Sequence, residues 1–331
     1  MQPPRFWYDD ASGRDAAPAL QLLLRPVSWV YAAVARGKVA RARPEAVLPA
    51  VCVGNATAGG AGKTPIVRAV RARLSARGVD AHTLSRGYGG ALKGPLRVDG
   101  GKHTAADVGD EPLLHARDGA AWIGADRVAA ARAAKAAGAQ ALVLDDGFQN
   151  MGLAYALSLL VFDARLGAGN GRVHPAGPLR EPLGDALSRA DGVIVMRDAA
   201  GDGEIQARLR HALGAFRGPV IPAWIAPSAP LPDKPLFAFA GIGQPDKFFA
   251  TLEAAGARLA GRLAFPDHHP YSERDMTNLA IDAAASGARL ITTEKDFVRI
   301  GTRWKPQVSV LPVGVHFADE AALDALLSRI G

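Results

Sequence analysis

The sequence predicts a mixed α/β protein that has a doubly wound, mainly parallel sheet in its first unit and a smaller α/β fold in its second. Three observations lead to this prediction. From residue 46 onward, continuous apolar runs that suit strands buried on both faces alternate with helical segments. A glycine-rich loop stands between the first such run and a helix. A segment rich in proline and polar residues, 228–235, separates these elements from a further set.

Length, charge and cysteine content limit the possible classes of protein. The 331 residues fit about two domains of roughly 150 residues each. The formal net charge of +7 favours anionic partners such as phosphorylated substrates or an acidic membrane surface. No nucleic-acid-binding module is recognisable, so we expect no nucleic-acid partner, and no obligate protein partner is evident. The single cysteine, Cys52, cannot form an internal disulfide and is expected in a buried strand.

Residues 16–35 have the pattern of an amphipathic helix. Gln21, Arg25 and Ser28 fall on one side of it. Preceding acidic residues argue against a signal peptide, and the central Arg25 and Pro26 argue against a membrane-spanning helix. The apolar positions on the other side are Leu20, Leu23, Leu24, Val27, Val30, Tyr31 and Val34.

A basic cluster between Arg36 and Arg43 follows this helix and contains no acidic residue. Two interpretations are open. The helix lies in a membrane interface, held by apolar burial and anionic headgroups, or it packs on the domain core as an ordinary first helix. The basic cluster and Trp29 favour the membrane interface. We therefore treat 1–44 as an N-terminal membrane-interface helix with a basic cluster.

The first α/β unit is expected over residues 45–228. Its strands are apolar runs bounded by turn residues, and its helices follow them. In chain order we expect a strand at 46–55, a helix at 64–78, a strand and turn at 79–90, a largely helical segment at 110–138 broken near 119–124, and strands at 139–150, 157–164 and 191–198.

The second unit is expected over residues 229–331, closing over the functional site of the first. It begins with a strand at 236–243 and a helix at 245–256. The segment "AFPDHHPYSERD" at 264–275 follows, then a long helix, a strand at 288–296 and a last strand–helix pair.

The stretch "GNATAGGAGKTP" at 54–65 has the context of a phosphate-binding P-loop, G-x-x-x-x-G-K-[ST], between a strand and a helix. Thr57 stands where the first glycine belongs, but the glycines that follow it can supply the bend. Backbone N–H groups and the helix N-terminus attract phosphate oxygens, and Lys63 reaches the β- and γ-phosphates. The alternative is a glycine-rich turn that matches by chance. The expected ATP-binding residues are Gly54, Asn55, Ala56, Thr57, Ala58, Gly59, Gly60, Ala61, Gly62, Lys63 and Thr64.

A magnesium site is expected beside this loop, giving the first unit the character of a P-loop NTPase. The hydroxyl of Thr64 can bind Mg²⁺, and a P-loop usually has a partner acid at the end of a neighbouring apolar strand. Asp145 and Asp146 in "ALVLDDGFQ" stand in such a place. Their alternative role is an ordinary turn, since Asp-Gly is a common turn dipeptide.

The motifs, taken together, resemble the tetraacyldisaccharide 4'-kinase family of the lipid A pathway in Gram-negative bacteria. They occur in the family's order from about residue 5 to the end of the chain: "GNATAGGAGKTP", "SRGYGG", "VGDEPLL", "DDGFQN", "GNGRVHPAGPLREP", "FPDHHPY" and "TTEKD". In that family threonine at the first P-loop position is normal. The departures are Asn150 where the family usually has His, and His174 where Leu is common.

This resemblance implies an enzyme that uses ATP and Mg²⁺ to phosphorylate the 4'-hydroxyl of a tetraacyl glucosamine disaccharide 1-phosphate, a lipid A precursor. It also implies a location on the cytoplasmic face of the bacterial inner membrane, entered through the N-terminal helix. The competing interpretations are a membrane-associated P-loop ATPase without a lipid acceptor and a nucleotide-binding scaffold without catalysis.

Phosphoryl transfer needs a positioned base. Asp110 in "VGDEP" can accept the proton of the sugar hydroxyl, or it can cap the helix that begins there. The resemblance favours the base, with Lys63 also catalytic. His268 or His269 can hydrogen-bond this aspartate and tune it, and the sequence does not choose between them.

Further residues are expected near the acceptor or the transferring phosphate, although each can instead be a surface ion pair or a turn residue. Glu294, Lys295 and Asp296 follow a strand and are candidates for nucleotide contact. The expected acceptor-binding residues are Tyr88, Glu111, Arg127, Gln149, Arg180 and Glu181.

Overall fold

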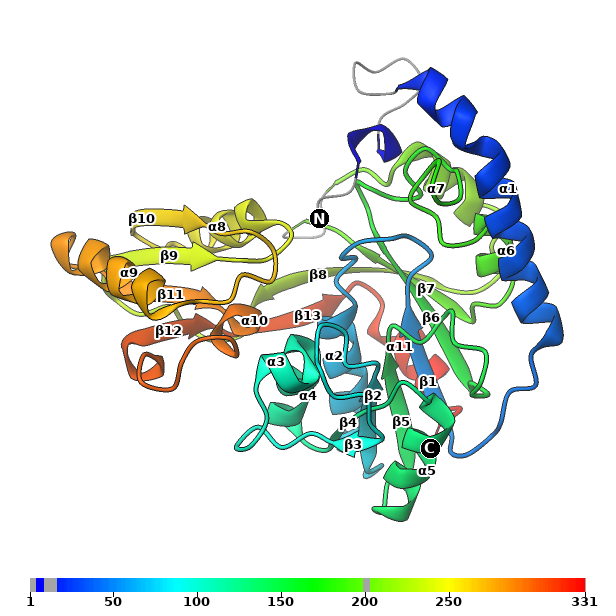
Figure 1. Cartoon of the computed structure of the whole chain (residues 1–331), viewed down its shortest axis with the longest axis horizontal. Helices are drawn as coiled ribbons and strands as arrows, with labels where there is room; N and C mark the ends of the chain where they lie inside the picture. The colour runs from blue at the N-terminus through cyan, green and yellow to red at the C-terminus, as the bar shows by residue number, and fades with distance from the viewer. Residues whose placement is uncertain (1–3, 9–16, 199–202, 331) are drawn as a thin grey trace.

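The computed structural model describes residues 4–8, 17–198 and 203–330. These residues form two α/β units that lie side by side (Figure 1). The larger unit contains a nine-stranded sheet in the order β13-β8-β7-β6-β1-β5-β2-β4-β3, and the smaller contains a four-stranded sheet in the order β10-β9-β11-β12. The predicted fold class, a doubly wound P-loop NTPase-like sheet with a second, smaller α/β unit, is confirmed.

Both sheets are dominated by parallel pairs. In the larger sheet β13 is antiparallel to β8 and β3 is antiparallel to β4, whereas the other neighbours run parallel. Its strands are β1 (Ala50–Gly54), β2 (Ala81–Ser85), β3 (Leu96–Arg97), β4 (Ala121–Ile123), β5 (Ala141–Asp145), β6 (Leu157–Asp163), β7 (Gly192–Met196), β8 (Val220–Pro227) and β13 (Val313–Phe317). Those of the smaller sheet are β9 (Leu236–Ala240), β10 (Leu259–Ala264), β11 (Arg289–Thr293) and β12 (Val308–Leu311).

Helices cover both faces of the larger sheet. The described helices of this unit are η1 (Arg5–Trp7), α1 (Pro18–Arg41), α2 (Lys63–Ala76), α3 (Ala105–Val108), α4 (Asp110–Asp118), α5 (Arg127–Ala136), α6 (Leu183–Leu187), α7 (Ala207–Leu213) and α11 (Glu320–Leu327). The smaller unit contains α8 (Pro245–Ala254), α9 (Glu273–Ala285), α10 (Glu294–Phe297) and η3 (Lys305–Gln307).

Side chains of the central strands alternate between two cores. Val53 and Val143 pack with α2 and α11, whereas Cys52 packs with α6 and α7 and Leu144 packs with α5. Parallel pairing sets Val53 beside Asp145. The P-loop and the acidic end of β5 therefore meet at the carboxyl edge of the sheet, where ligands bind in open α/β folds.

The last strand and helix do not stay in the second unit. We expected residues 229–331 to form one unit, but β13 pairs with β8 of the larger sheet, and α11 buries Leu323, Leu326 and Leu327 in the core under α2. The boundary drawn near residue 229 therefore marks where the chain leaves the larger sheet, and the chain returns to that sheet after β12. An edge strand such as β8 offers unpaired backbone groups, and β13 satisfies them.

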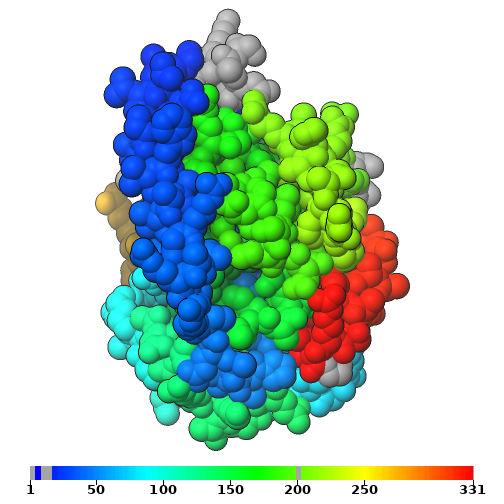
Figure 2. Space-filling view, turned by 90° about the vertical axis from the view of Figure 1, so that its right-hand side faces the viewer, coloured from blue at the N-terminus to red at the C-terminus, as the bar shows by residue number. Residues whose placement is uncertain are grey.

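Helix α1 is longer than expected and takes in much of the basic cluster, since it runs to Arg41. It lies along the outside of the larger unit (Figure 2). Two residues of its predicted polar side, Gln21 and Ser28, are buried together with Ala32, whereas Arg25 is exposed. Large apolar side chains on it are exposed instead, namely Leu20, Leu22, Leu23, Val27, Trp29, Val30, Tyr31 and Val34. Among the described residues, no helix has the length and apolar character needed to cross a membrane.

Candidate active site

The P-loop spans the turn between β1 and α2. Asn55 donates from Nδ2 to the carbonyl of Gly59 at 3.2 Å, a hydrogen bond that joins the two ends of this part of the loop. Gly62, the residue before α2, has a φ of 79°, a left-handed value that favours glycine. Gly54 is also required, because a Cβ at this position would lie 2.5 Å from Cβ of Phe148. The turn after β5 thus packs directly on the start of the P-loop.

A second segment, residues 170–180, supports the P-loop from outside. The amide of Ala58 donates to the carbonyl of Pro178 at 2.7 Å, and the amide of Arg180 donates to the carbonyl of Ala56 at 2.7 Å. These bonds hold the backbone of Arg180 against the P-loop, so that its side chain lies beside the loop. The predicted P-loop residues therefore form one turn, and Arg180 joins them through the backbone.

Two cations converge on Asp146. Nη1 of Arg180 lies 3.1 Å from both carboxylate oxygens, and Nζ of Lys63 lies 3.6 Å from Oδ1. Burial alone would raise the pKa of Asp146, but Lys63 and Arg180 outweigh it and hold that pKa below its ordinary value. Asp146 has a φ of 57°, which turns its side chain back toward the loop. Two positive groups are thus gathered where phosphate oxygens would lie.

Asp145, the last residue of β5, is buried. Its Oδ2 lies 2.9 Å from Nε2 of His115, and its Oδ1 is buried without a hydrogen-bond partner in the described part of the chain. An orphaned carboxylate oxygen beside a P-loop fits a hard cation such as Mg²⁺, which is usually held by one or two carboxylates together with substrate phosphates. Asp145, Asp146 and the neighbouring Thr64 are the residues that would hold such a cation. The described residues contain no larger cluster of metal-binding side chains.

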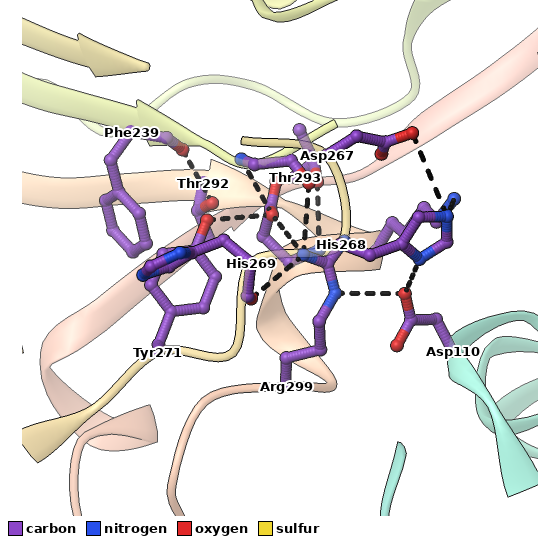
Figure 3. Close-up of polar contacts among 12 residues, drawn as sticks. Asp110, Phe239, Asp267, His268, His269, Tyr271, Thr292, Thr293 and Arg299 are labelled. Carbon is purple, nitrogen blue, oxygen red and sulfur yellow. Dashed lines mark hydrogen bonds and ion pairs between the residues drawn. The ribbon is translucent and has the colours of Figure 1, made fainter. Parts of the chain in front are cut away.

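Asp110 begins α4, and its carboxylate points toward the second unit (Figure 3). Its Oδ2 lies 2.8 Å from Nδ1 of His268 and 3.0 Å from Nε of Arg299. Burial opposes ionisation, but the His268 hydrogen bond and the Arg299 charge outweigh it and lower the pKa of Asp110. The capping alternative is not observed: Gly109 is the N-cap residue of α4, and it has no side chain to cap with.

The two adjacent histidines have different surroundings. His268 has a φ of 59° and faces Asp110, and its Nε2 lies 3.5 Å from Nζ of Lys295. His269 turns the other way. It lies 3.1 Å from Asp275 of α9 and stacks on Phe265 with 4.6 Å between ring centroids. The structure therefore associates His268 with Asp110, a choice that the sequence left open.

Arg299 was not among the residues that the sequence indicated. Its Nη1 lies 3.3 Å from Oδ1 of the fully buried Asp296, which also accepts from the hydroxyl of Tyr271 at 2.8 Å and the amide of Gly241 at 2.9 Å. This buried network fixes Arg299 against Asp110. The spacing of three residues between Asp296 and Arg299, typical of an ion pair on one helical turn, is the only sequence signal that could have indicated it.

Three of the expected acceptor-binding residues form one network at the P-loop. Gln149 donates from Nε2 to Oε1 of Glu181 at 3.2 Å and to the Asn55 carbonyl at 3.1 Å, and it accepts from Arg180 at 3.0 Å. The buried Glu181 is also held by Arg189, at 2.6 Å. This network links the turn after β5 to the 170–180 segment.

The other three expected acceptor residues lie outside that network. Tyr88 has an exposed side chain (77%) in a loop that packs closely on Gly109. Arg127 is buried and donates to the carbonyl of Gly124. Its burial lowers the pKa of the guanidinium. Oε1 of Glu111 lies 4.0 Å from Nζ of Lys295. The pKa of Glu111 is raised, mainly by its burial and also by the nearby Asp145 carboxylate.

The second unit reaches the first through charged side chains. Arg68 of α2 is paired with Glu294 of α10 at 2.7 Å and also with Asp118. Lys247 of α8 lies 2.9 Å from Asp163 at the end of β6. Of the expected nucleotide contacts, Glu294 and Lys295 therefore lie at the boundary between the units, whereas Asp296 is buried inside the second.

Comparisons with known proteins agree on one group. The model of a protein family described as Tetraacyldisaccharide-1-P 4'-kinase, LpxK, matches residues 20–331. A tetraacyldisaccharide 4'-kinase of Rhodospirillum centenum is 50% identical over 332 residues, covering 100% of this chain and 97% of that relative. One of Caulobacter vibrioides is 50% identical over 335 residues, covering 99% and 98%.

Solved structures also match. The crystal structure of an "apo" form of LpxK from Aquifex aeolicus in complex with ATP superposes with a TM-score of 0.74 and 25% sequence identity. The match covers 94% of this chain and 99% of that one.

Proposed function

This chain belongs to the tetraacyldisaccharide 4'-kinase family, and from that membership we propose how its described site carries out the reaction. The enzyme transfers the γ-phosphate of ATP to the 4'-hydroxyl of a tetraacyldisaccharide 1-phosphate in lipid A biosynthesis. The assignment of roles rests on two clusters of charged side chains. Lys63, Asp146 and Arg180 stand at the P-loop, and Asp110 with His268 stands where the second unit meets α4.

The P-loop side supplies positive charge to the phosphates. Lys63 and Arg180 face Asp146 and are placed to pair with phosphate oxygens, because a phosphate offers more negative charge than one carboxylate. Mg²⁺, when bound with ATP, would supply positive charge to the phosphates. Thr64, Asp145 and Asp146 are the residues proposed to hold it.

The proposed base stands on α4 of the larger unit and faces the second unit. Asp110 is ionised at neutral pH because its pKa lies below the ordinary value, so it can accept the proton of the attacking hydroxyl. His268 lies 2.8 Å from it and orients the carboxylate. Tyr88, Glu111, Arg127, Gln149, Arg180 and Glu181 remain proposals as contacts to the acceptor.

A transfer assay tests these roles. Lys63→Ala should abolish transfer of label from ATP to the disaccharide lipid without lowering thermal stability, since it removes charge and no core packing. The exposed Lys135→Ala on α5 is the matched control and should retain full activity. Near-normal turnover in Lys63→Ala would refute the nucleotide site. ATP hydrolysis without label in the lipid would favour an ATPase.

The exposed apolar side of α1 supports attachment to the cytoplasmic face of the inner membrane as a peripheral protein. Leu23 and Val30 are 78% and 65% exposed, and each would gain about 1.5–3 kcal/mol on full burial. Lys38 and Arg41 on the same helix add attraction to anionic headgroups, by about 1 kcal/mol per charge near the surface. Because α1 packs on the protein through Gln21, Ser28 and Ala32, its large apolar side chains remain free for another partner, and an anionic lipid surface suits both these side chains and the basic residues.

Vesicle flotation tests this attachment. The double change Leu23→Asp and Val30→Asp should release the protein from vesicles that contain anionic lipid, while the melting temperature stays unchanged because both side chains are exposed. Ile281→Asp, at an exposed apolar residue of α9, is the control and should still float. Unchanged flotation of the double variant would refute the membrane role. Loss of folding would favour a helix packed on the core.

A further inference from the structure

His115 is on the same helix as the proposed base Asp110 and contacts the proposed metal ligand Asp145. It is on α4, five residues after Asp110, and it is almost fully buried (1% exposed). Its Nε2 lies 2.9 Å from Oδ2 of Asp145, whose side chain is equally buried. An ionised carboxylate can only accept hydrogen bonds, so the proton between these atoms is on Nε2 of His115.

This hydrogen bond occupies one carboxylate oxygen and leaves the other without a partner. Oδ1 of Asp145 is buried and unsatisfied within the described residues. A buried carboxylate oxygen without a donor is costly unless a cation or a donor arrives. The side chain is also fixed in rotation, because the His115 contact holds one of its two oxygens. The free oxygen is therefore held in place at the end of β5, beside the P-loop.

His115 is itself anchored by the fold. The guanidinium of Arg71 on α2 donates to the His115 carbonyl at 3.4 Å and to the carbonyl of Ala81 at 2.8 Å. Helix α4 thus has its His115 turn tied to α2 and β2, while its first turn presents Asp110 to the second unit. One rigid helix therefore carries both the proposed base and the group that orients the proposed metal ligand.

We propose that His115 is a positioning residue that holds Asp145 with one carboxylate oxygen available for the Mg²⁺ of Mg·ATP. The inference rests on the proposed function, since it assumes that Asp145 binds the metal of a nucleotide complex. Partners that orient metal ligands typically change metal affinity by about 10- to 100-fold when they are removed. A merely structural histidine would change stability and leave the Mg²⁺ dependence of nucleotide binding as it was.

Three substitutions separate these roles. His115→Gln keeps an N–H donor at about the reach of Nε2, His115→Asn is one methylene shorter, and His115→Leu removes the donor while filling similar space. Binding of ATP is measured by calorimetry in EDTA and across a MgCl₂ titration, together with the melting temperature of each variant. These binding readouts do not depend on turnover.

The expected result is a Mg²⁺ requirement raised about 10- to 100-fold in His115→Leu and His115→Asn, with binding in EDTA unchanged and with His115→Gln close to the parent. A parent-like Mg²⁺ titration in the Leu or Asn variant overturns the inference. If His115→Leu does not fold, His115→Asn decides. Failure of the parent itself to bind ATP in a Mg²⁺-dependent way would instead overturn the proposed function.

Discussion

Two regions near the P-loop are held to the larger unit by different interactions. The N-terminal side consists of η1, α1 and the 170–180 segment. Besides an exposed ion pair between Arg36 of α1 and Asp185 of α6, this side has hydrogen bonds that involve backbone groups and neutral side chains. Tyr8 donates from its hydroxyl to the carbonyl of Ala58 at 3.2 Å. Asn170 donates to the carbonyls of Phe6 and Ala176 at 3.2 and 2.9 Å, and the Ala176 amide donates to Ser28 of α1 at 3.1 Å.

The second-unit side is held mainly by ion pairs. Arg299 faces Asp110, Arg68 faces Glu294, and Lys247 faces Asp163. Pairs of this kind, where they are partly exposed, contribute only about 0.2–1 kcal/mol each and are screened by salt. A charged side chain in such a pair can also bind a phosphate or a hydroxyl of a ligand in place of its partner.

The two regions therefore contribute different things to the site. Directed hydrogen bonds on the N-terminal side fix the conformation of the P-loop and the position of Arg180. Charged groups of the second unit, Arg299 and His268, face the proposed base Asp110 of the larger unit. Substitutions in the two regions should accordingly differ in their effects on turnover, on stability and on salt dependence.

The largest effect is expected at Asp110. Asp110→Asn keeps the size of the side chain but removes the base, so turnover in the lipid transfer assay should fall about 10²- to 10⁴-fold. The melting temperature should also fall, because the buried Arg299 loses the charge that it faces, so turnover is measured well below the melting temperature of the variant. Asp282→Asn at an exposed site on α9 is the control. A variant that keeps its turnover but melts early would show that Asp110 matters for structure alone.

The two histidines form a natural matched pair. His268→Ala removes a hydrogen bond to a charged group, worth about 1.5–3 kcal/mol, and should lower turnover about 10- to 100-fold. His269→Ala removes the Phe265 stacking and the Asp275 contact, so it should lower the melting temperature with little change in turnover. Equal loss of turnover in both variants would contradict the assignment of His268 to Asp110.

Asn170 tests the N-terminal side. Asn170→Ala leaves the buried bond to the Ala176 carbonyl unmade and removes one of the two side-chain donors to the Phe6 carbonyl, the other being Gln21, which should cost about 1–3 kcal/mol of unfolding free energy. The loss should be the same at low and high salt, since no ion pair is involved. Denaturant unfolding at two salt concentrations measures it, with the exposed Asn278→Ala as the control. A strongly salt-dependent loss would break the comparison.

Arg68 tests the second-unit side. Arg68→Gln removes its pairs with Glu294 and Asp118 and should lower the unfolding free energy by about 0.2–1 kcal/mol at low salt, with a smaller loss at high salt. The same two-salt unfolding experiment applies, and the exposed Arg274→Gln serves as the control. A loss that is independent of salt would show that the contact acts by packing.

The smallest effect is expected in the pH dependence of stability. The pKa of Asp110 lies below its ordinary value of 3.8 in the folded protein. Its contribution to stability is therefore full above that ordinary value and is lost as the pH falls through the folded pKa. Asp110→Asn should unfold with a weaker acid dependence than the parent between pH 5 and the acid limit of folding. Identical acid profiles would argue against the ion pair with Arg299.

Local patterns were sufficient for much of this protein. The strand, glycine-rich loop and helix around Gly62, Lys63 and Thr64 follow from neighbours in sequence, and so do the two acids that end β5. Their geometry is set within a few residues, so the P-loop was predictable without tertiary structure. The amphipathic pattern of α1 was likewise evident from its spacing. Family resemblance added the reaction and its acceptor.

Tertiary structure decided which distant groups meet. His268 and His269 are adjacent and chemically alike, so only the path of the 264–275 segment selects the one that reaches Asp110. His115 and Arg299 depend on contacts across 30 residues or more, His115 with Asp145 and Arg299 with Asp110, which no local spacing records. The return of β13 to the larger sheet was missed because a strand pattern does not say which edge it joins. The inward direction of Gln21 and Ser28 was settled by the backbone groups they meet on the larger unit.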